Sequence, residues 1–459
     1  MQASRGRLAA PFASVPDHLA ARHQQKLARI TAQLRAHVDG TPLSLKKRSV
    51  SHQVPKPGDL RHKDAKIDVS DLTEILWIDP VTRLCIAESG VTFVDLVAAT
   101  MPYGLVPIIV PELKTITVGG AVAGCSIESM SFVHGGFHDT CTAYEVVAAT
   151  GDVLACTPDN EHALVFQMVH GTFGVCGIVT LLAFRLVPAL AFVKLTYETH
   201  ATIEAYLASI AQHTRDRDID LMDGIIHAPT KYVLCIGRFV AEAPYTSRYD
   251  WMKIYWESTG TRVEDYLPTA DYFFRYDRGV TNVRPKSFLG RLLFGKFIAS
   301  TQMLWLGHKL HWLLPREHPT ITLDVFVPIS RVPEFLAWYA KTFKFYPLWC
   351  VPYHIARRYE WLSDAYWSGV KDEMFLDLAI YGMKQHGDAN YHKLMEDKLA
   401  ELGGVKTLIA HNYYDEAQFW TIWNKPNHDA VKAITDPKNL LRDLYGKMVR
   451  AAMGKAASA

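Results

Sequence analysis

The sequence has no pair of cysteines at CxxC spacing and no marked excess of one charge. Its cysteines stand singly, at positions 85, 125, 141, 156, 176, 235 and 350. This scatter fits reduced thiols rather than a disulfide framework or a zinc site. The formal net charge is only +2, which excludes a strong nucleic-acid footprint. We therefore expect neither a metal nor a nucleic acid as a partner.

Long apolar runs are also missing. No uninterrupted apolar stretch reaches the roughly 18 residues that indicate a transmembrane helix, and the N-terminus lacks the apolar core of a secretion signal. We expect a cytoplasmic protein with peripheral contact at the inner face of the membrane. With 459 residues, of which 49% are hydrophobic, the chain is long enough for two or three domains with sizeable cores.

A dinucleotide-binding GxGxxG motif between a strand and a helix is absent as well. NAD(P)H therefore has no Rossmann site of its own in this sequence. Glycine is instead concentrated in 117–124 (TVGGAVAG) and 171–177 (GTFGVCG), on either side of a predicted hairpin over 144–156. Glycine lets a backbone approach a ligand closely, and successive N–H groups in a turn bind anions such as a pyrophosphate. We interpret both segments as turns of a flavin cradle, although glycine-rich turns also occur in other hairpin-rich β domains.

The neighbouring motifs make this interpretation more specific. They are Pro111-Glu112-Leu113, Ile127-Glu128-Ser129, 141–145 (CTAYE) and Cys156-Thr157-Pro158. Together with 117–124 they resemble the FAD domain of the vanillyl-alcohol-oxidase (p-cresol methylhydroxylase) superfamily, and within it the Δ24-sterol reductase branch. The segments 95–100 (DLVAAT), 102–105 (PYGL) and 113–117 (LKTIT) are similar to bacterial reductases of 10-methylene fatty acids. The resemblance covers roughly residues 43–448.

The resemblance implies an α+β fold with several parts. An N-terminal extension and helix would occupy 1–42, and an FAD-binding domain of the vanillyl-alcohol-oxidase type would occupy 43–188. A mixed-sheet substrate or cap domain would follow over 189–418. A helical segment over 419–459 would pack back on the FAD domain.

Local patterns predict several elements of this fold. Apolar spacing predicts a helix over 16–38 with a basic polar face. The polar stretch 43–68 is interpreted as a hairpin and loop. A helix over 92–103 is expected to end at Gly104, and a strand is expected over 175–186.

The resemblance also implies which residues bind FAD. The segment 117–129 would wrap the pyrophosphate and the isoalloxazine, and Gly174, Gly177 and Ile178 would pass beside the adenine. Ser49 and Ser51 stand where the family has an earlier phosphate loop, with a solvated polar turn as the alternative. The remaining implied residues are Pro111, Glu112, Thr117, Val118, Gly119, Gly120, Ala121, Val122, Ala123, Gly124, Cys125, Ser126, Ile127, Glu128 and Ser129.

Some members of the superfamily attach the flavin covalently through a histidine or a cysteine. His134, Cys125 and Cys141 are the candidates by proximity. The sterol reductase branch has a tyrosine at the position of His134, so the resemblance favours non-covalent FAD.

Reduction of an unactivated C=C bond needs a hydride on one carbon and a proton on the other, the latter from a general acid. Aromatic and charged residues gather in 271–278 (DYFFRYDR), 346–354 and 411–415. From these segments we select Tyr276, Arg278, His354 and Tyr413 as catalytic candidates, each with a purely structural role as the alternative. Arg278 would instead suit a carboxylate or phosphate head group.

The segment 282–316 contains Arg284, Lys286, Arg291, Lys296, Lys309 and Arg316 and no acidic residue. Phenylalanine and tryptophan alternate with these bases, a pattern typical of a helix that lies on a membrane surface. The alternative is a pair of cap-domain helices with solvated bases.

We therefore expect an FAD-dependent oxidoreductase that reduces a carbon–carbon double bond in a lipid. The substrate would be a methylene-branched fatty acyl chain or a sterol-like molecule. Electrons would come from NAD(P)H, with a hydride from flavin N5 and a proton from a side-chain acid. Two alternatives remain open at this point. One is a dehydrogenase or oxidase that introduces unsaturation or oxidises an alcohol, and the other is a non-catalytic flavin-binding lipid-associated protein.

Overall fold

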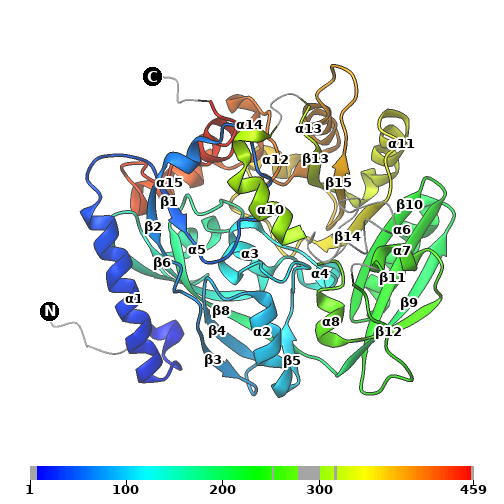
Figure 1. Ribbon diagram of the computed structural model, residues 1–459, viewed down its shortest axis with the longest axis horizontal. Helices are drawn as coiled ribbons and strands as arrows, with labels where there is room; N and C mark the ends of the chain where they lie inside the picture. The colour runs from blue at the N-terminus through cyan, green and yellow to red at the C-terminus, as the bar shows by residue number, and fades with distance from the viewer. Residues whose placement is uncertain (1–7, 251–252, 278–299, 315–317, 456–459) are drawn as a thin grey trace.

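The computed structural model describes residues 8–250, 253–277, 300–314 and 318–455. Two large sheets and the helices around them form the molecule (Figure 1), which confirms the α+β class. The six-stranded sheet consists of β3 (Ile75–Asp79), β4 (Leu84–Glu88), β8 (Ile178–Pro188), β6 (Cys141–Val147) and β7 (Val153–Cys156) in that order, with β5 (Leu105–Pro107) paired to β8. We call this part the flavin-side sheet.

The elements of the flavin-side sheet follow the sequence patterns closely. The hairpin β6–β7 is confirmed, and so is α1 (Asp17–Ala36). Helix α2 (Phe93–Thr100) begins after Thr92, whose side chain accepts a hydrogen bond from the backbone N–H of Asp95. A short 3-10 turn extends α2 to Gly104, which adopts the left-handed conformation at φ 67°. The predicted strand over 175–186 begins three residues later, at Ile178.

Two predictions for this part were wrong. Strands β1 (Leu43–Lys46) and β2 (Ala65–Asp68) pair in parallel and form no hairpin. Parallel neighbours need a long crossover, and residues 47–64 provide it. The segment 117–124 is not a turn but helix α3 (Val118–Gly124), because the Thr117 side chain caps it by accepting from Gly120 N at 3.2 Å.

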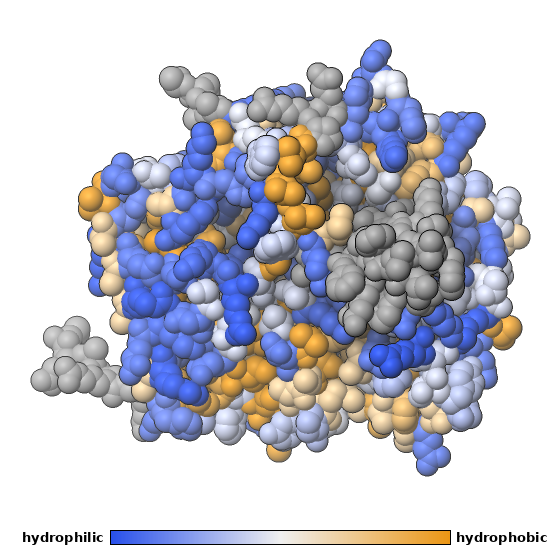
Figure 2. Space-filling view, viewed as in Figure 1, coloured by the Kyte–Doolittle hydropathy of each residue, from blue (hydrophilic) through white to orange (hydrophobic). Residues whose placement is uncertain are grey.

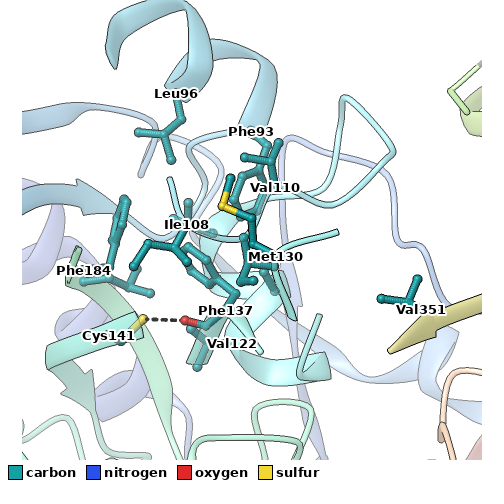
Figure 3. Close-up of a cluster of buried hydrophobic side chains, with 14 of the residues drawn as sticks. Phe93, Leu96, Ile108, Val110, Val122, Met130, Phe137, Cys141, Phe184 and Val351 are labelled. Carbon is teal, nitrogen blue, oxygen red and sulfur yellow. Dashed lines mark hydrogen bonds between the residues drawn. The ribbon is translucent and has the colours of Figure 1, made fainter. Parts of the chain in front are cut away.

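Helix α3 is fixed by a tightly packed core (Figure 3). Phe93 of α2 meets Phe137 edge-on at 5.1 Å, and Val122 of α3 belongs to the same cluster. Cys141 lies inside this cluster, where its Sγ donates to the Phe137 carbonyl at 3.5 Å. The core therefore orients one face of α3 inward and leaves the other face available.

The second sheet has eight strands, and all neighbours are antiparallel. Their order is β12 (Glu264–Pro268), β9 (Phe192–His200), β11 (Lys231–Val240), β10 (Leu221–Ala228), β14 (Leu348–His354), β15 (Met374–Met383), β13 (Ile321–Pro328) and β16 (Val405–Lys406). One face packs against α6 (Ile203–Asp216), α11 (Val332–Thr342) and α13 (Tyr391–Leu402). The other face, which we call the inner face, shares a core with the flavin-side sheet.

The described residues form eight further α-helices. They are α4 (Ser131–His134), α5 (Ala163–Met168), α7 (Tyr255–Thr259), α8 (Thr269–Phe273), α10 (Ser300–Lys309), α12 (Asp364–Gly369), α14 (Glu416–Ile422) and α15 (Lys425–Thr435). The C-terminal helices lie on the flavin-side sheet, where Ala149 N donates to the Thr435 carbonyl at 2.6 Å. Lys447 Nζ reaches the Phe173 carbonyl at 2.8 Å. The domain limits expected from the sequence stay a prediction.

Candidate functional site

A cavity of about 410 Å³ is lined by residues from both halves of the chain. The segment 47–55, the loop 111–117, helix α3 and Phe173 form one part of its wall. Residues of β13, β14 and β15 form the opposite part, and Met303 and Leu304 of α10 contribute at another side. Its size is typical of a site for a cofactor or small molecule.

About half of the predicted FAD residues line this cavity. These are Ser49, Ser51, Pro111, Glu112, Thr117, Gly120, Ala123, Gly124, Cys125, Ser126 and Ile127. Helical periodicity explains the selection within α3, because residues three and four apart share one face. Val118, Ala121 and Val122 belong to the opposite face and are buried in the core.

The other predicted FAD residues lie elsewhere. A Cβ on Gly119 would meet Ser89 Cβ at 2.7 Å, so this glycine allows close packing of α3 on the end of β4. Gly177 packs on Val146, and Ile178 is buried in a separate cluster with Val147. Glu128 and Ser129 are buried below the cavity wall, and Gly174 does not line the cavity.

The segment 47–55 brings polar groups to the cavity. His52 Nε2 lies 3.1 Å from Thr115 Oγ1, and Val54 N donates to the Ile409 carbonyl at 3.0 Å. His308 of α10 holds the segment from outside, with Nε2 at 3.1 Å from the Ser51 carbonyl and 3.0 Å from the Gln53 carbonyl. Lys47 also lines the cavity.

These groups fit an elongated ligand that carries phosphates. Lys47 offers a cation and Ser49, Ser51 and Ser126 offer hydroxyl groups. Gly120 and Gly124 leave the cavity side of α3 without side chains, while Pro111, Ile116 and Phe173 supply apolar surface for ring systems. The lining thus suits FAD.

The three candidates for a covalent flavin link lie in different surroundings. Cys125 lines the cavity, whereas Cys141 is enclosed in the core and His134 on α4 does not line the cavity. Burial raises the pKa of the Cys125 thiol well above its ordinary value, which disfavours the reactive thiolate. Non-covalent attachment of FAD stays a prediction.

Comparison with known proteins identifies the cofactor. Residues 20–157 match the FAD binding domain family. The human Δ24-sterol reductase is 24% identical over 414 residues, which covers 85% of this chain and 78% of that protein. The chain is an FAD-dependent oxidoreductase. The Arabidopsis thaliana Δ24-sterol reductase is also 24% identical, over 88% of this chain and 80% of its own length. A rice cytokinin dehydrogenase is 23% identical over 52% of this chain and 48% of its own length.

Three carboxyl groups that line the cavity of the oxidoreductase form no salt bridge within the described residues. We call Glu112, Asp324 and Asp377 the unpaired cluster, because no salt bridge reaches them within the described part of the chain. Burial is the main cause that raises the pKa of Glu112 to about 8 and that of Asp324 to about 6. Burial, and then the charges of Asp324 and Glu112, raise the pKa of Asp377 well above its ordinary value.

A second acidic group on the inner face contains a cation. We call Asp223, Glu128 and Arg275 the paired cluster, since the Arg275 guanidinium lies 3.0 Å from Asp223 Oδ2 and 3.2 Å from Glu128 Oε1. Tyr276 OH donates to Asp223 at 2.7 Å, and Trp349 Nε1 donates to it at 2.9 Å. Tyr276 is therefore placed in a buried network rather than at the cavity.

Two other catalytic candidates, His354 and Tyr413, also lie away from the cavity lining. His354 ends β14 opposite Met374. Tyr413 stacks on His392 at 5.9 Å and borders a different, polar cavity with Lys56 and His411. Arg278 lies outside the described residues. Catalytic roles for these four residues stay predictions.

The sequence pattern did not single out Asp324 and Asp377, although it contains a signal for both. Each is the one charged residue in an otherwise apolar strand, in ITLDVFVP and MFLDLAIYGM. A charge at a core-facing strand position is costly unless it is paired and hydrogen-bonded, so an acid kept there indicates a functional candidate. The two aspartates come to the same cavity only through strand pairing, which the local sequence does not reveal.

An apolar pocket of about 80 Å³ adjoins the cavity, and we call it the aromatic annex. It shares Gly124, Cys125, Ile127, Phe173, Phe326 and Thr407 with the cavity. Its remaining wall includes Tyr353, Tyr359, Trp361, Tyr366, Trp367, Phe375 and Trp423. Tyr359 OH donates to Asp139 at 2.9 Å, and Tyr359 stacks on Trp361 at 5.4 Å between ring centres. The annex therefore presents mostly ring faces.

Proposed function

We propose that the oxidoreductase reduces a carbon–carbon double bond in a lipid, using electrons from NAD(P)H. The substrate is a methylene-branched acyl chain or a sterol-like molecule. The observation that supports this proposal most strongly is the aromatic annex, because an apolar pocket that adjoins the cavity suits a hydrocarbon. The names of the sterol reductases among the relatives agree with a lipid alkene.

When bound, FAD supplies the hydride-transfer centre. The cavity side of α3 and the segment 47–55 would hold it, and Lys47 would face its phosphates. Phe173, Phe326 and Ile127 lie where the cavity meets the annex, so they would keep water away from the alkene. A nicotinamide would reach the flavin from the substrate side, since the sequence has no Rossmann motif.

The unpaired cluster supports reduction over the reverse chemistry. A dehydrogenase needs a carboxylate that accepts a proton, whereas a reductase needs an acid that supplies one. Burial, and then the charges of Asp324 and Glu112, raise the pKa of Asp377 well above its ordinary value, which favours the protonated acid. The cavity is thus better suited to protonate an alkene than to deprotonate a saturated chain.

The mass of the lipid product tests whether the protein reduces or oxidises its substrate. The purified protein, loaded with FAD, is incubated with NADPH and a phospholipid that carries a 10-methylene acyl chain, and the acyl chain is analysed by mass spectrometry. We expect the mass to rise by that of two hydrogens. An unchanged methylene lipid, together with loss of two hydrogens from the matching saturated lipid, would support the dehydrogenase instead.

We further propose that the segment 282–316 contacts the membrane surface. Its described part, 300–314, includes α10, and Trp305, Leu306, Trp312 and Leu313 are exposed there. Figure 2 shows the hydrophobic patch over α10, and Lys309 Nζ lies 4.4 Å from the Trp305 ring centre. Bases beside exposed tryptophans suit an anionic lipid surface.

The same helix also touches the cavity, since Met303 and Leu304 line it. A lipid could therefore enter from the bilayer beside α10. None of the helices in the described ranges is both long and apolar enough to span a bilayer. Sedimentation with vesicles of anionic phospholipid tests the contact. Trp312→Glu should weaken binding, and Val81→Glu, at another exposed position, should not.

A further inference from the structure

Strand pairing brings two aspartates to one side of the eight-stranded sheet. Asp377 on β15 stands opposite Phe326 of β13, and Asp324 on β13 stands opposite Ala379 of β15. Alternate residues of paired strands share a face, so both aspartates lie on the inner face. Both line the cavity, and Glu112 lines it from the flavin-side half.

Both aspartates are enclosed, but their hydrogen bonding differs. Tyr381 OH donates to Asp324 Oδ1 at 2.5 Å. Asp377 is 2% exposed, and its Oδ1 has no hydrogen-bond partner in the described part of the chain. Among the described residues, no group of acidic, histidine or cysteine side chains has the arrangement of a metal site. An orphaned buried oxygen at a cavity wall indicates a group that awaits a ligand.

The proton balance of the cluster follows from these contacts. Neighbouring buried carboxyl groups without a cation do not all ionise together. The bond from Tyr381 stabilises the ionised form of Asp324, whereas Asp377 has no such donor at Oδ1, so these contacts favour the proton on Asp377 over Asp324. The other titratable groups of the cavity lining, besides Tyr381, are Glu112, Lys47, His52 and Cys125, and the charges of Glu128 and Arg275 act on Glu112.

We propose that Asp377 donates the proton that completes reduction of the alkene, and that Asp324, held by Tyr381, keeps Asp377 protonated. This inference rests on the proposed function. The O–H bond of Asp377 breaks and leaves its electron pair on the carboxylate, while the alkene π pair forms the new C–H bond. When bound, reduced FAD would supply a hydride, with its electron pair, to the other alkene carbon, and NAD(P)H would supply these two electrons. Water would reprotonate Asp377.

The two half-reactions separate this role from a structural one. In Asp377→Asn, we expect NADPH to reduce the flavin at the wild-type rate. Reoxidation of the reduced protein by the 10-methylene lipid should slow by about 10²–10⁴-fold, the usual contribution of a general acid. Asp265→Asn is the matched control, because Asp265 is a buried aspartate of the same sheet that accepts from Tyr249 but pairs with Arg262 and does not line the cavity.

The pH dependence of flavin reoxidation tests the role proposed for Asp324. Wild-type reoxidation should fall as pH rises through the pKa of Asp377, because only the protonated acid donates. In Asp324→Asn the like charge that raises this pKa is gone, so the fall should move to lower pH. If Asp324 had a purely structural role, the pH at which the reoxidation rate falls would be the same in wild type and Asp324→Asn.

Infrared spectroscopy of the FAD-free protein gives a readout that needs no turnover. The difference spectrum of wild type minus Asp377→Asn should contain the C=O stretch of a protonated carboxylic acid at neutral pH. The same difference for Asp265→Asn should lack that band.

The outcomes are distinct. If the alkene fails to reoxidise the wild-type flavin, the proposed function fails, and the infrared band still reports the proton on Asp377. If Asp377→Asn reoxidises normally, or if only Glu112→Gln is slow, the inference is overturned and the proposed function stands.

Discussion

The two acidic clusters on the inner face of the eight-stranded sheet differ in one respect, the presence of a cation. Asp223 of the paired cluster faces Arg275 and accepts bonds from Tyr276 and Trp349. Asp377 of the unpaired cluster forms no salt bridge within the described residues and lines the cavity, whereas Oδ1 lacks a hydrogen-bond partner in both aspartates. Buried charges that are neutralised serve the fold, whereas a buried acid without a cation is retained where its proton is used. Burial alone therefore does not mark a catalytic acid.

Loss of the cation should have the largest effect on stability. Arg275→Met would leave Asp223 and Glu128 buried without compensation, so we expect the free energy of unfolding to fall by about 3–5 kcal/mol. Asp377→Asn removes no salt bridge and should change it much less. Urea unfolding of the two FAD-free variants measures both values. Equal destabilisation would show that the unpaired cluster also serves the fold, and the contrast between the clusters would be lost.

A third buried network extends the comparison to α1. His23 lies 2.8 Å from both Glu88 and Glu145 on the flavin-side sheet. Burial lowers the pKa of His23, but the bonds to Glu145 and Glu88 outweigh it and raise this pKa from 6.5 to about 9. Because the folded protein binds the proton more tightly, the stabilisation is complete below about pH 6.5 and is lost as pH rises through about 9.

His23→Gln should therefore lower the free energy of unfolding most at low pH. A shift of this size corresponds to about 3 kcal/mol, and the difference in unfolding free energy between wild type and variant should shrink towards high pH. Chemical unfolding over this range measures the difference. A gap that stays constant with pH would mean that His23 is held neutral.

Two adjacent glycines of α3 differ in role: Gly119 allows close packing, and Gly120 faces the cavity. A Cβ on Gly119 would meet Ser89 Cβ at 2.7 Å, so Gly119→Ala should cost about 1–3 kcal/mol through overpacking. A Cβ on Gly120 meets only Thr117 Oγ1 at 3.2 Å and faces the cavity. Gly120→Val should therefore lose FAD while the FAD-free protein unfolds like the wild type. The flavin-to-protein absorbance ratio and urea unfolding test the pair, and full FAD content in Gly120→Val would place the cofactor elsewhere.

The sequence predicted the elements that are set by residues close together in the chain. It missed those that depend on contacts between distant segments. Helix α1 and the hairpin β6–β7 follow from periodicity and from the turn at Gly151. Glycine content suggested a turn at 117–124, but the Thr117 cap and the packing of Val118 and Val122 outweigh the low helix propensity of glycine.

The candidate site shows the same limit. The cavity side of α3 was among the predicted residues, but so was its core side, because the sequence does not say which face is covered. The unpaired cluster escaped prediction since Asp324 and Asp377 stand on strands that meet only through the register of β13 and β15. The dense aromatic segment around Tyr276 instead forms the buried surroundings of Arg275.

The visible absorption of the flavin under nitrogen tests the central claim most directly. NADPH is added to the FAD-loaded protein, followed by a 10-methylene phospholipid or its saturated counterpart. The proposed reductase predicts that NADPH bleaches the flavin and that only the methylene lipid restores the colour. A flavin that stays oxidised with NADPH and is bleached by a saturated or hydroxylated lipid would contradict it.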